Sequence, residues 1–242
     1  MFRTIMVCVI LPLLPASASA QVSAAPPATP GLHRLMFQRD GAPTVGYAIL
    51  IPANYSPSKP VPLILALHFG VGAGDAAGAG GDMVEILIGP ALAQLGAIIV
   101  APDSLRGNWS TPENEKAVNA LLDVIVARYA IDKKKTAVTG FSMGGTGSWH
   151  FLEKFPERFS AAIPIAGTPP ASASGWRLPV LAIHSRDDQV APFKPTEARI
   201  AELQKAGVNA RLIALSGITH YETDRFADAL RQAVPWLREV WK

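Results

Sequence analysis

Residues 136–147 read TAVTGFSMGGTG, and they are the most informative stretch of the chain. An apolar run at residues 136–141 passes directly into Gly140-Phe141-Ser142-Met143-Gly144, which matches the pattern G-x-S-x-G. Residues 145–154, which follow, are helix-like in composition. Where a strand turns sharply into a helix, glycines on both sides of the turn let the two elements pack closely. The stretch therefore predicts a strand, a tight turn at Ser142 and a helix.

A serine in this position has the properties of a nucleophile. The strained backbone of such a turn lifts the Ser142 hydroxyl above the edge of the sheet, where a substrate can reach it. The same turn places the N–H of Met143 at a helix N-terminus, where it can face a developing negative charge. A glycine-rich turn without chemistry is the alternative interpretation, because so short a pattern is weak support when it stands alone.

The rest of the chain alternates between strand-like and helix-like patterns. Continuous apolar runs, which are typical of strands buried on both faces of a parallel sheet, occupy residues 61–69, 97–101, 161–165, 180–184 and 210–215. Apolar stripes at helical spacing occupy residues 118–129 and 226–241. Pro112 suits a first helical turn, whereas Pro235 should kink the last helix or start a new one.

This alternation predicts an α/β fold, with a mostly parallel central sheet flanked by helices. Two earlier runs, at residues 32–39 and 44–51, are joined near Asp40-Gly41 and predict an N-terminal antiparallel hairpin. The link between residues 165 and 180 is short, so no large cap domain is expected. A hydrophobic content of 49% and a charged content of 17% agree with one globular domain.

A serine hydroxyl attacks poorly unless a neighbouring base removes its proton. Serines on a strand-turn-helix of this kind are followed in the chain by an acid and then a histidine. Residues 184–192 (HSRDDQVAP) and 217–220 (GITH) each follow a buried strand, so they lie on loops at the carboxyl edge of the sheet. Of the five histidines, only His220 lies on such a loop after both the serine and an acid. His150 and His184 suit structural positions, and the acid is either Asp187 or Asp188.

Three segments resemble a known family: residues 46–70, residues 178–220 and residues 139–167, which read TGFSMGGTGSWHFLEKFPERFSAAIPIAG. They are similar to bacterial carboxylesterases and predicted peptidases of the prolyl-oligopeptidase-related group, which have the α/β-hydrolase fold. The resemblance implies Ser142 as nucleophile, Asp188 as acid and His220 as base. It favours Asp188 over Asp187 because the family's acid stands four residues after the histidine that ends the strand.

The same resemblance implies where an oxyanion would be stabilised. One backbone N–H donor would be that of Met143, directly after the nucleophile. The second donor comes from the turn after the third strand, which usually reads His-Gly-x in relatives and reads His68-Phe69-Gly70 in this chain. Gly70 is favoured by its position, and Phe69 is the alternative.

Several polar and aromatic residues are expected near this site. Arg106, Asn108 and Trp109 follow the end of one buried strand, and Trp176 precedes another, so all four are predicted to line a pocket, with packing at the surface as the alternative. The glycine- and alanine-rich residues 70–81 are expected to form a mobile rim. They contain neither G-x-G-x-x-G nor Gly-Lys-Ser/Thr, which argues against a nucleotide site.

Charge and cysteine content exclude other classes of function. The net charge is +3, and the one lysine cluster, residues 133–135, is expected to be a solvated turn and not a nucleic-acid patch. Cys8 is the only cysteine, and no two histidines have the spacing of metal ligands. Neither a metal ion nor another cofactor is therefore expected.

The N-terminus has the parts of a secretory signal peptide: Arg3, an apolar run at residues 5–14, and small residues at 16–20. The run is too short to span a bilayer. Residues 1–20 are expected to be cleaved, residues 21–31 to be a flexible leader, and residues 32–242 to form the catalytic domain. A secreted or periplasmic bacterial protein without a stable membrane anchor is expected.

Together these features predict a serine hydrolase that cleaves a small-molecule or polymeric carboxylic ester through a Ser-His-Asp triad and an acyl-enzyme intermediate. A serine peptidase of the prolyl-oligopeptidase-related type is one alternative, because the same triad cleaves amides. A non-catalytic binding protein on a hydrolase scaffold is the other. The sequence makes no prediction of oligomeric state.

Overall fold

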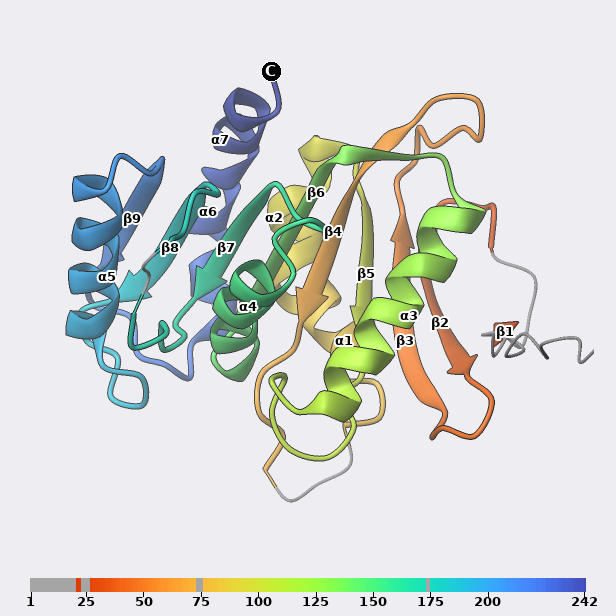
Figure 1. Cartoon of the computed structure of the whole chain (residues 1–242), viewed down its shortest axis with the longest axis horizontal. Coiled ribbons are helices and arrows are strands. Elements are labelled where there is room, and N and C mark those ends of the chain that lie inside the picture. The colour runs from red at the N-terminus through yellow and green to blue at the C-terminus, as the bar shows by residue number, and fades with distance from the viewer. Residues whose placement is uncertain (1–20, 23–26, 73–75, 173–174) are drawn as a thin grey trace, which may run out of the picture.

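The computed structural model describes residues 21–22, 27–72, 76–172 and 175–242 (Figure 1). The predicted signal peptide, with Cys8, lies outside the described residues. The strands are β1 (Gln21–Val22), β2 (Gly31–Gln38), β3 (Val45–Ile51), β4 (Val61–Leu67), β5 (Ile98–Pro102), β6 (Ile131–Phe141), β7 (Ala161–Ile165), β8 (Val180–Ser185) and β9 (Ala210–Leu215). The helices are α1 (Ala79–Met83), η1 (Val84–Ile88), α2 (Gly89–Leu92), η2 (Ala93–Leu95), α3 (Pro112–Arg128), α4 (Met143–Lys154), α5 (Phe193–Lys205), η3 (Thr223–Phe226), α6 (Ala227–Arg231) and α7 (Ala233–Val240).

In the described part of the chain, nine strands form one sheet in the order β1-β2-β3-β5-β4-β6-β7-β8-β9. All neighbours from β5 to β9 are parallel. The pairs β1–β2, β2–β3 and β3–β5 are antiparallel. This topology confirms the predicted α/β fold, with its mostly parallel sheet and its N-terminal hairpin. Each apolar run of the sequence forms a strand because the sheet is covered on both faces.

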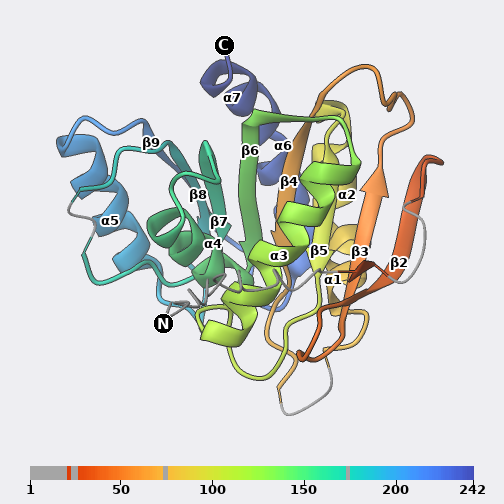
Figure 2. The same ribbon diagram turned by 45° about the vertical axis from the view of Figure 1, so that its right-hand side comes forward.

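Two layers of helices provide that cover. In Figures 1 and 2, α3, α4 and α5 lie on one face of the sheet, and α1, α2, α6 and α7 lie on the other. The core of the first face contains Leu121 and Leu203. The core of the second contains Leu87 and Leu237. Strands β5 and β7 are buried along their whole length between the two layers, which explains why their sequences lack polar alternation.

The order of the strands reverses at β4. From β4 the chain crosses to β5 on one side, and it returns to β6 on the other side of β4. The loop after β4 leads to α1 on one face, and the loop after β6 leads to α4 on the opposite face. Where two such loops diverge, the carboxyl ends of the strands leave a crevice that commonly holds a ligand. In Figure 1 the arrowheads of β4 and β7 point to the lower edge of the sheet, so these carboxyl ends lie there.

The ends of two helices follow from single residues. Thr111 precedes α3, and its side-chain oxygen accepts a hydrogen bond from the N–H of Asn114, while Pro112 occupies the first helical position. Near the C-terminus, α6 ends before Gln232 and α7 begins at Ala233, with Pro235 in its first turn. Pro235 therefore belongs to the start of a new helix, which was one of the two outcomes predicted for it.

Two segments differ from expectation. Residues 21–31 were predicted to be a flexible leader, yet Gln21 and Val22 pair with β2 and Gly31 already belongs to it. Residues 133–135 were predicted to be a turn but lie within β6. The register there passes from Ile131 opposite Val61 to Thr136 opposite Leu63, so the lysines lie in a bulge. Among the residues described, no helix is both long and apolar enough to cross a membrane.

Candidate active site

Ser142 connects β6 to α4 through a sharply turned backbone. Its φ of 57° and ψ of −115° lie in a region that residues other than glycine avoid. The N–H of Ser142 donates to the carbonyl of Ile165 at 2.9 Å, and the N–H of Thr146 donates to the carbonyl of Ser142 at 3.0 Å. These two bonds hold the strained conformation in place. The serine side chain is left half-buried at the crevice.

Two glycines make this turn possible. A Cβ atom on Gly140 would lie 2.5 Å from the carbonyl oxygen of Leu67, and a Cβ on Gly144 would lie still closer to the same atom. No larger residue fits at either position, because the start of α4 packs directly against the end of β4. The close approach also brings the loop after β4 to the N-terminus of α4.

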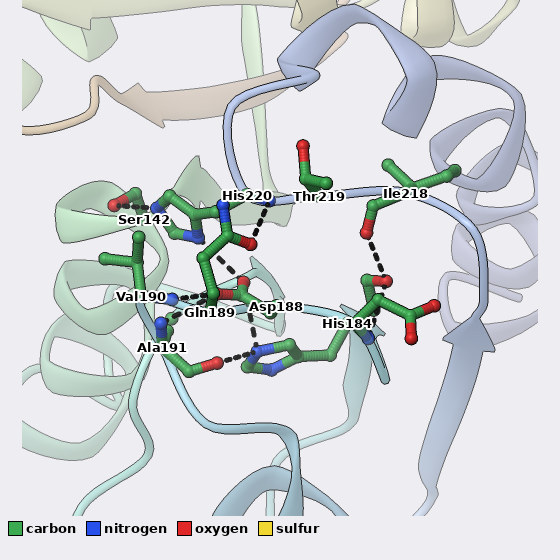
Figure 3. Close-up of polar contacts among 12 residues, drawn as sticks. Ser142, His184, Asp188, Gln189, Val190, Ala191, Ile218, Thr219 and His220 are labelled. Atoms are coloured by element: carbon green, nitrogen blue, oxygen red, sulfur yellow. Dashed lines mark hydrogen bonds and ion pairs between the residues drawn. The ribbon is translucent and has the colours of Figure 1, made fainter.

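His220, on the loop after β9, faces Ser142 (Figure 3). Its Nε2 lies 2.8 Å from Ser142 Oγ, and its Nδ1 lies 2.7 Å from Asp188 Oδ2. Because a carboxylate only accepts, Nδ1 carries the proton and Nε2 accepts the hydrogen bond from the serine hydroxyl. The structure therefore brings the residues predicted as nucleophile, acid and base into one chain of hydrogen bonds.

The Asp188 carboxylate is fully buried, and both its oxygens have partners. Oδ1 accepts from the N–H of Val190 at 2.9 Å and from the N–H of Ala191 at 2.7 Å. Oδ2 faces His220, and Nε2 of His184 lies 3.5 Å from it. With Oδ1 held by the backbone, the carboxylate presents its second oxygen to the imidazole in a fixed direction.

His184 holds the loop that carries this acid. Its Nε2 donates to the carbonyl of Ala191 at 2.9 Å, and its Nδ1 accepts from the hydroxyl of Thr196 at 2.9 Å. Burial lowers the pKa of His184, although the Ala191 carbonyl and the Asp188 carboxylate act in the opposite direction. The ring is therefore neutral at neutral pH, and its contacts are structural.

Asp187, the alternative acid, points to a different partner. Its Oδ2 accepts from the N–H of Gly217 at 2.6 Å. Gly217 belongs to the loop that carries His220, so Asp187 binds that loop without contacting the imidazole. The structure thus places Asp188, and not Asp187, against His220.

Two further side chains join the same two loops. Ser185 Oγ donates to the carbonyl of Ile218 at 2.6 Å, and Gln189 Oε1 accepts from the N–H of His220 at 3.3 Å (Figure 3). With Asp187, they form what we call the loop interlock: Ser185, Asp187 and Gln189. Sequence reasoning did not find this role for Ser185 or Gln189. The one signal in the sequence is that Ser185, Asp187 and Gln189 stand at every second position, from the end of β8 into the loop that carries Asp188.

Glu222 closes the His220 loop from its other side. Its Oε2 accepts from the N–H of Thr219 at 2.7 Å and from the hydroxyl of Thr219 at 2.8 Å, while Oε1 accepts from Arg225. The hydrogen bond from the Thr219 N–H, helped by Arg225 and the Thr219 hydroxyl, lowers the pKa of Glu222 to about 2. The carboxylate therefore stays charged, and keeps these bonds, well into the acid range.

The N–H groups predicted as oxyanion donors come from neighbouring turns. Met143 is the first residue of α4, where an N–H has no acceptor within the helix. A Cβ on Gly70 would lie 3.9 Å from Met143 Cβ, so the turn after β4 lies directly against that helix end. Phe69 packs partly on the core beneath. Gly70 and Phe69 both stay as predictions for the second donor.

His68 fixes the shape of that turn. The N–H of Ser104 donates to its Nε2 at 2.9 Å, so Nδ1 carries the proton and donates to the carbonyl of Phe69 at 2.6 Å. The ring is completely buried, and burial lowers its pKa. His68 thereby connects the turn after β4 to the end of β5.

A cavity of about 1530 Å³ opens beside Gly70 and Met143. The hairpin of β2 and β3, the loop after β4 and the loop after β5 contribute its walls. Its lining includes Met36, Tyr47, Leu105, Arg106 and Asn108. The cavity lies on the β2–β5 side of Ser142, whereas Asp188 and His220 come from β8 and β9 on the other side.

The prediction that Trp109 and Trp176 line a pocket is wrong. Trp109 is 1% exposed, and its Nε1 donates to the carbonyl of His68 at 3.0 Å. Trp176 is 7% exposed and packs on Trp149 in α4, with ring centroids 5.4 Å apart. Both indoles fill the core because large aromatic rings gain most free energy by leaving water.

The arrangement has the parts that acyl transfer needs. A serine hydroxyl faces an imidazole, a buried carboxylate orients that imidazole, and a helix N-terminus lies beside the serine. Within the described part of the chain, no group of three histidine, cysteine, aspartate or glutamate side chains is arranged to hold a metal ion.

Comparison with known proteins gives a consistent result. Residues 62–198 match the family described as alpha/beta hydrolase fold. Feruloyl esterase C of Emericella nidulans is 31% identical over 160 residues, which cover 61% of this chain and 56% of that protein. The chain thus spans about half the length of the curated relatives it matches.

Solved structures with a similar fold include two esterases. A thermostable esterase has a TM-score of 0.69 at 22% identity, covering 86% of this chain and 62% of its own. A ferulic acid esterase has a TM-score of 0.68 at 15% identity, covering 88% of this chain and 99% of its own. At these identities the likeness concerns the fold. With the family match over more than half of its length, and with the strained serine between β6 and α4 of a mostly parallel sheet, the chain belongs to the alpha/beta hydrolase family.

Proposed function

We propose that the protein hydrolyses carboxylic esters, with Ser142, His220 and Asp188 as its catalytic triad. The observation that carries the proposal is the His220 imidazole, which reaches Ser142 Oγ at 2.8 Å and Asp188 Oδ2 at 2.7 Å. The esterase names of the relative and of both structural neighbours support an ester as substrate.

The mechanism follows from the positions of these groups. His220 Nε2 takes the proton of Ser142 Oγ as that oxygen attacks the acyl carbon, and Asp188 stabilises the imidazolium that forms. The N–H of Met143 and the N–H of Gly70 or Phe69 donate to the oxyanion. The imidazolium then gives its proton to the leaving alkoxide, which departs as an alcohol. Water, activated by the same imidazole, releases the acid and restores the serine.

The relative's name suggests an acyl group to test first. Feruloyl esterase C is named for a hydroxycinnamoyl ester, and a cavity of about 1530 Å³ beside the donor N–H groups has room for an aryl-propenoyl chain. We include hydroxycinnamate esters in the proposed substrate class, together with short acyl esters and polyester oligomers.

The central experiment compares the parent protein with Ser142→Ala on p-nitrophenyl esters and aminoacyl amides in parallel. The parent should cleave esters much faster than amides, and Ser142→Ala should lose nearly all ester hydrolysis. Full activity in Ser142→Ala would refute the proposal. Faster cleavage of amides would favour a peptidase, and failure of a fluorophosphonate probe to label the parent would favour a binding protein.

We further propose that residues 1–20 direct export and are removed. The support is the order of Arg3, the apolar run and the small residues that end at Ala20. Mass spectrometry of protein recovered outside the cytoplasm should find Gln21 at the N-terminus. Recovery of the uncleaved chain from the cytoplasm alone would contradict this.

A further inference from the structure

Two exposed apolar side chains lie on the loops that carry Asp188 and His220. Among the described residues, four large hydrophobic side chains are exposed, and two of them, Val190 at 50% and Tyr221 at 77%, lie on the loops that carry the acid and the base. Tyr221 follows His220 directly, and its ring meets the imidazole edge-on, with centroids 5.9 Å apart at 85°. We call Val190 and Tyr221 the apolar ledge.

The backbone of both ledge residues lies next to the proposed catalytic groups. The N–H of Val190 donates to Asp188 Oδ1 at 2.9 Å, so its backbone position depends on the catalytic acid. Tyr221 is covalently next to the base, on a loop that Glu222 and the loop interlock hold in place. The backbone that carries both side chains is therefore held close to Asp188 and His220.

Proton transfer determines which part of an ester lies near the ledge. The leaving oxygen must come within hydrogen-bond reach of His220 Nε2, because that atom supplies its proton. The oxyanion must point toward Met143 and the turn after β4. The alcohol part of the ester is thus directed to the β8–β9 side of Ser142, where the ledge lies. The acyl part is left with the β2–β5 side, where the cavity lies.

We propose that the apolar ledge of Val190 and Tyr221 is the subsite for the alcohol part of the substrate, and that it selects alcohols with an apolar or aromatic face. The inference rests on the proposed ester hydrolysis. It adds that the alcohol part and the acyl part of the ester bind on opposite sides of Ser142. An exposed ring can pack against an aryl or alkyl group and remove its surface from water. The cavity on the β2–β5 side would hold the acyl group instead.

A pair of esters with one acyl group tests this directly. Methyl and 2-phenylethyl esters of the same acid release aliphatic alcohols of similar basicity, so they differ chiefly in apolar contact. Tyr221→Ala should lower kcat/KM for the 2-phenylethyl ester about fivefold, the size of one aromatic pair. It should leave the methyl ester nearly unchanged. Tyr221→Phe keeps the ring and should resemble the parent.

Two controls separate the ledge from general effects. Ile86→Ala truncates another exposed apolar side chain, 45% exposed on η1, and should change neither ester. Deacylation rates, measured in single turnovers, should be the same for Tyr221→Ala and the parent, because the alcohol has already left. Transfer of the acyl group to added 2-phenylethanol should fall in Tyr221→Ala, since the same subsite binds the incoming alcohol.

The outcomes distinguish the two proposals. Equal losses on both esters, or a slower deacylation, would show that Tyr221 acts on His220 and would overturn the alcohol subsite. No loss on either ester would overturn it too. In both cases the loss of ester hydrolysis in Ser142→Ala would still support the proposed function. The alcohol subsite can therefore be wrong while the proposed function is right.

Discussion

Asp187 and Asp188 carry the same carboxylate one residue apart, and the structure gives them different partners. Asp188 is buried and faces His220, whereas Asp187 binds the N–H of Gly217. A carboxylate orients an imidazole through a hydrogen bond, and only Asp188 makes that bond to His220. The neighbouring acid provides a matched control that few sites offer.

Asp188→Asn should lower kcat by roughly three to four orders of magnitude, because an amide N–H facing His220 stabilises the wrong imidazole tautomer. KM should change little. Asp187→Asn keeps an oxygen for the Gly217 N–H and should stay within about twofold of the parent. Steady-state kinetics on one p-nitrophenyl ester measures both. Equal losses in the two variants would contradict the assignment of the acid.

Gly144→Ala tests the contact between β4 and α4. Its Cβ would fall against the carbonyl oxygen of Leu67, which belongs to the backbone and cannot move aside cheaply. The variant should lose about 3 kcal/mol or more of unfolding free energy, or fail to fold. Gly70→Ala, whose Cβ would meet nothing nearer than 3.9 Å, should unfold at the parent's urea midpoint. A stable Gly144→Ala would show that the turn has more room than described.

At the scale of elements, the site depends on the two loops that follow β8 and β9. The loop after β8 carries the acid, and the loop after β9 carries the base. The loop interlock joins them through side chain to backbone bonds at Gly217, Ile218 and His220. Because these bonds end on backbone atoms, they fix the backbone conformation of the loop after β9.

Ser185→Ala should therefore lower both stability and kcat. The buried carbonyl of Ile218 would lose its donor, at a cost of about 1–3 kcal/mol. Displacement of His220 should lower kcat about tenfold with little change in KM. Ser160→Ala is the control, because Ser160 Oγ also donates to a backbone carbonyl, that of Thr136, which lies in the middle of β6 and away from His220. It should lower the Tm and leave kcat unchanged, and a similar kcat loss in both would contradict the interlock.

At the scale of the molecule, two buried neutral histidines connect the loops at the carboxyl edge of the sheet. His68 joins the turn after β4 to β5, and His184 joins β8 to α5. Burial lowers the pKa of each from 6.5. Both must therefore take up a proton when the chain unfolds in mildly acid solution, which links the stability of the whole fold to pH.

Stability should fall as the pH drops below about 6.5. In that range the unfolded chain binds protons that the folded chain does not, so unfolding free energy decreases by up to about 1.4 kcal/mol per pH unit for each histidine. The loss ends when the pH passes the lowered folded pKa. Urea unfolding from pH 7.5 to 5 measures the slope. His184→Asn should be less stable at pH 7.5 but should show a flatter slope, and parallel curves would contradict the linkage.

The sequence predicted the sheet well because its strands are apolar on both faces, a pattern that burial leaves directly in the chain. It predicted the residues at the site through their order along the chain and through family resemblance. It could not place Trp109 or Trp176, because a loop residue beside a strand end can turn toward the cavity or toward the core with the same local sequence. The loop interlock could not be predicted from the sequence either, because it depends on the distance in space between two loops about thirty residues apart in the chain.

The strained backbone of Ser142 has an evolutionary consequence. Glycine would adopt a φ of 57° at lower cost than serine, so folding alone favours the residue that cannot attack a substrate. The proposed function accounts for a serine at this position in spite of that cost. A relative that does not carry out the reaction should accept glycine here and gain stability from it.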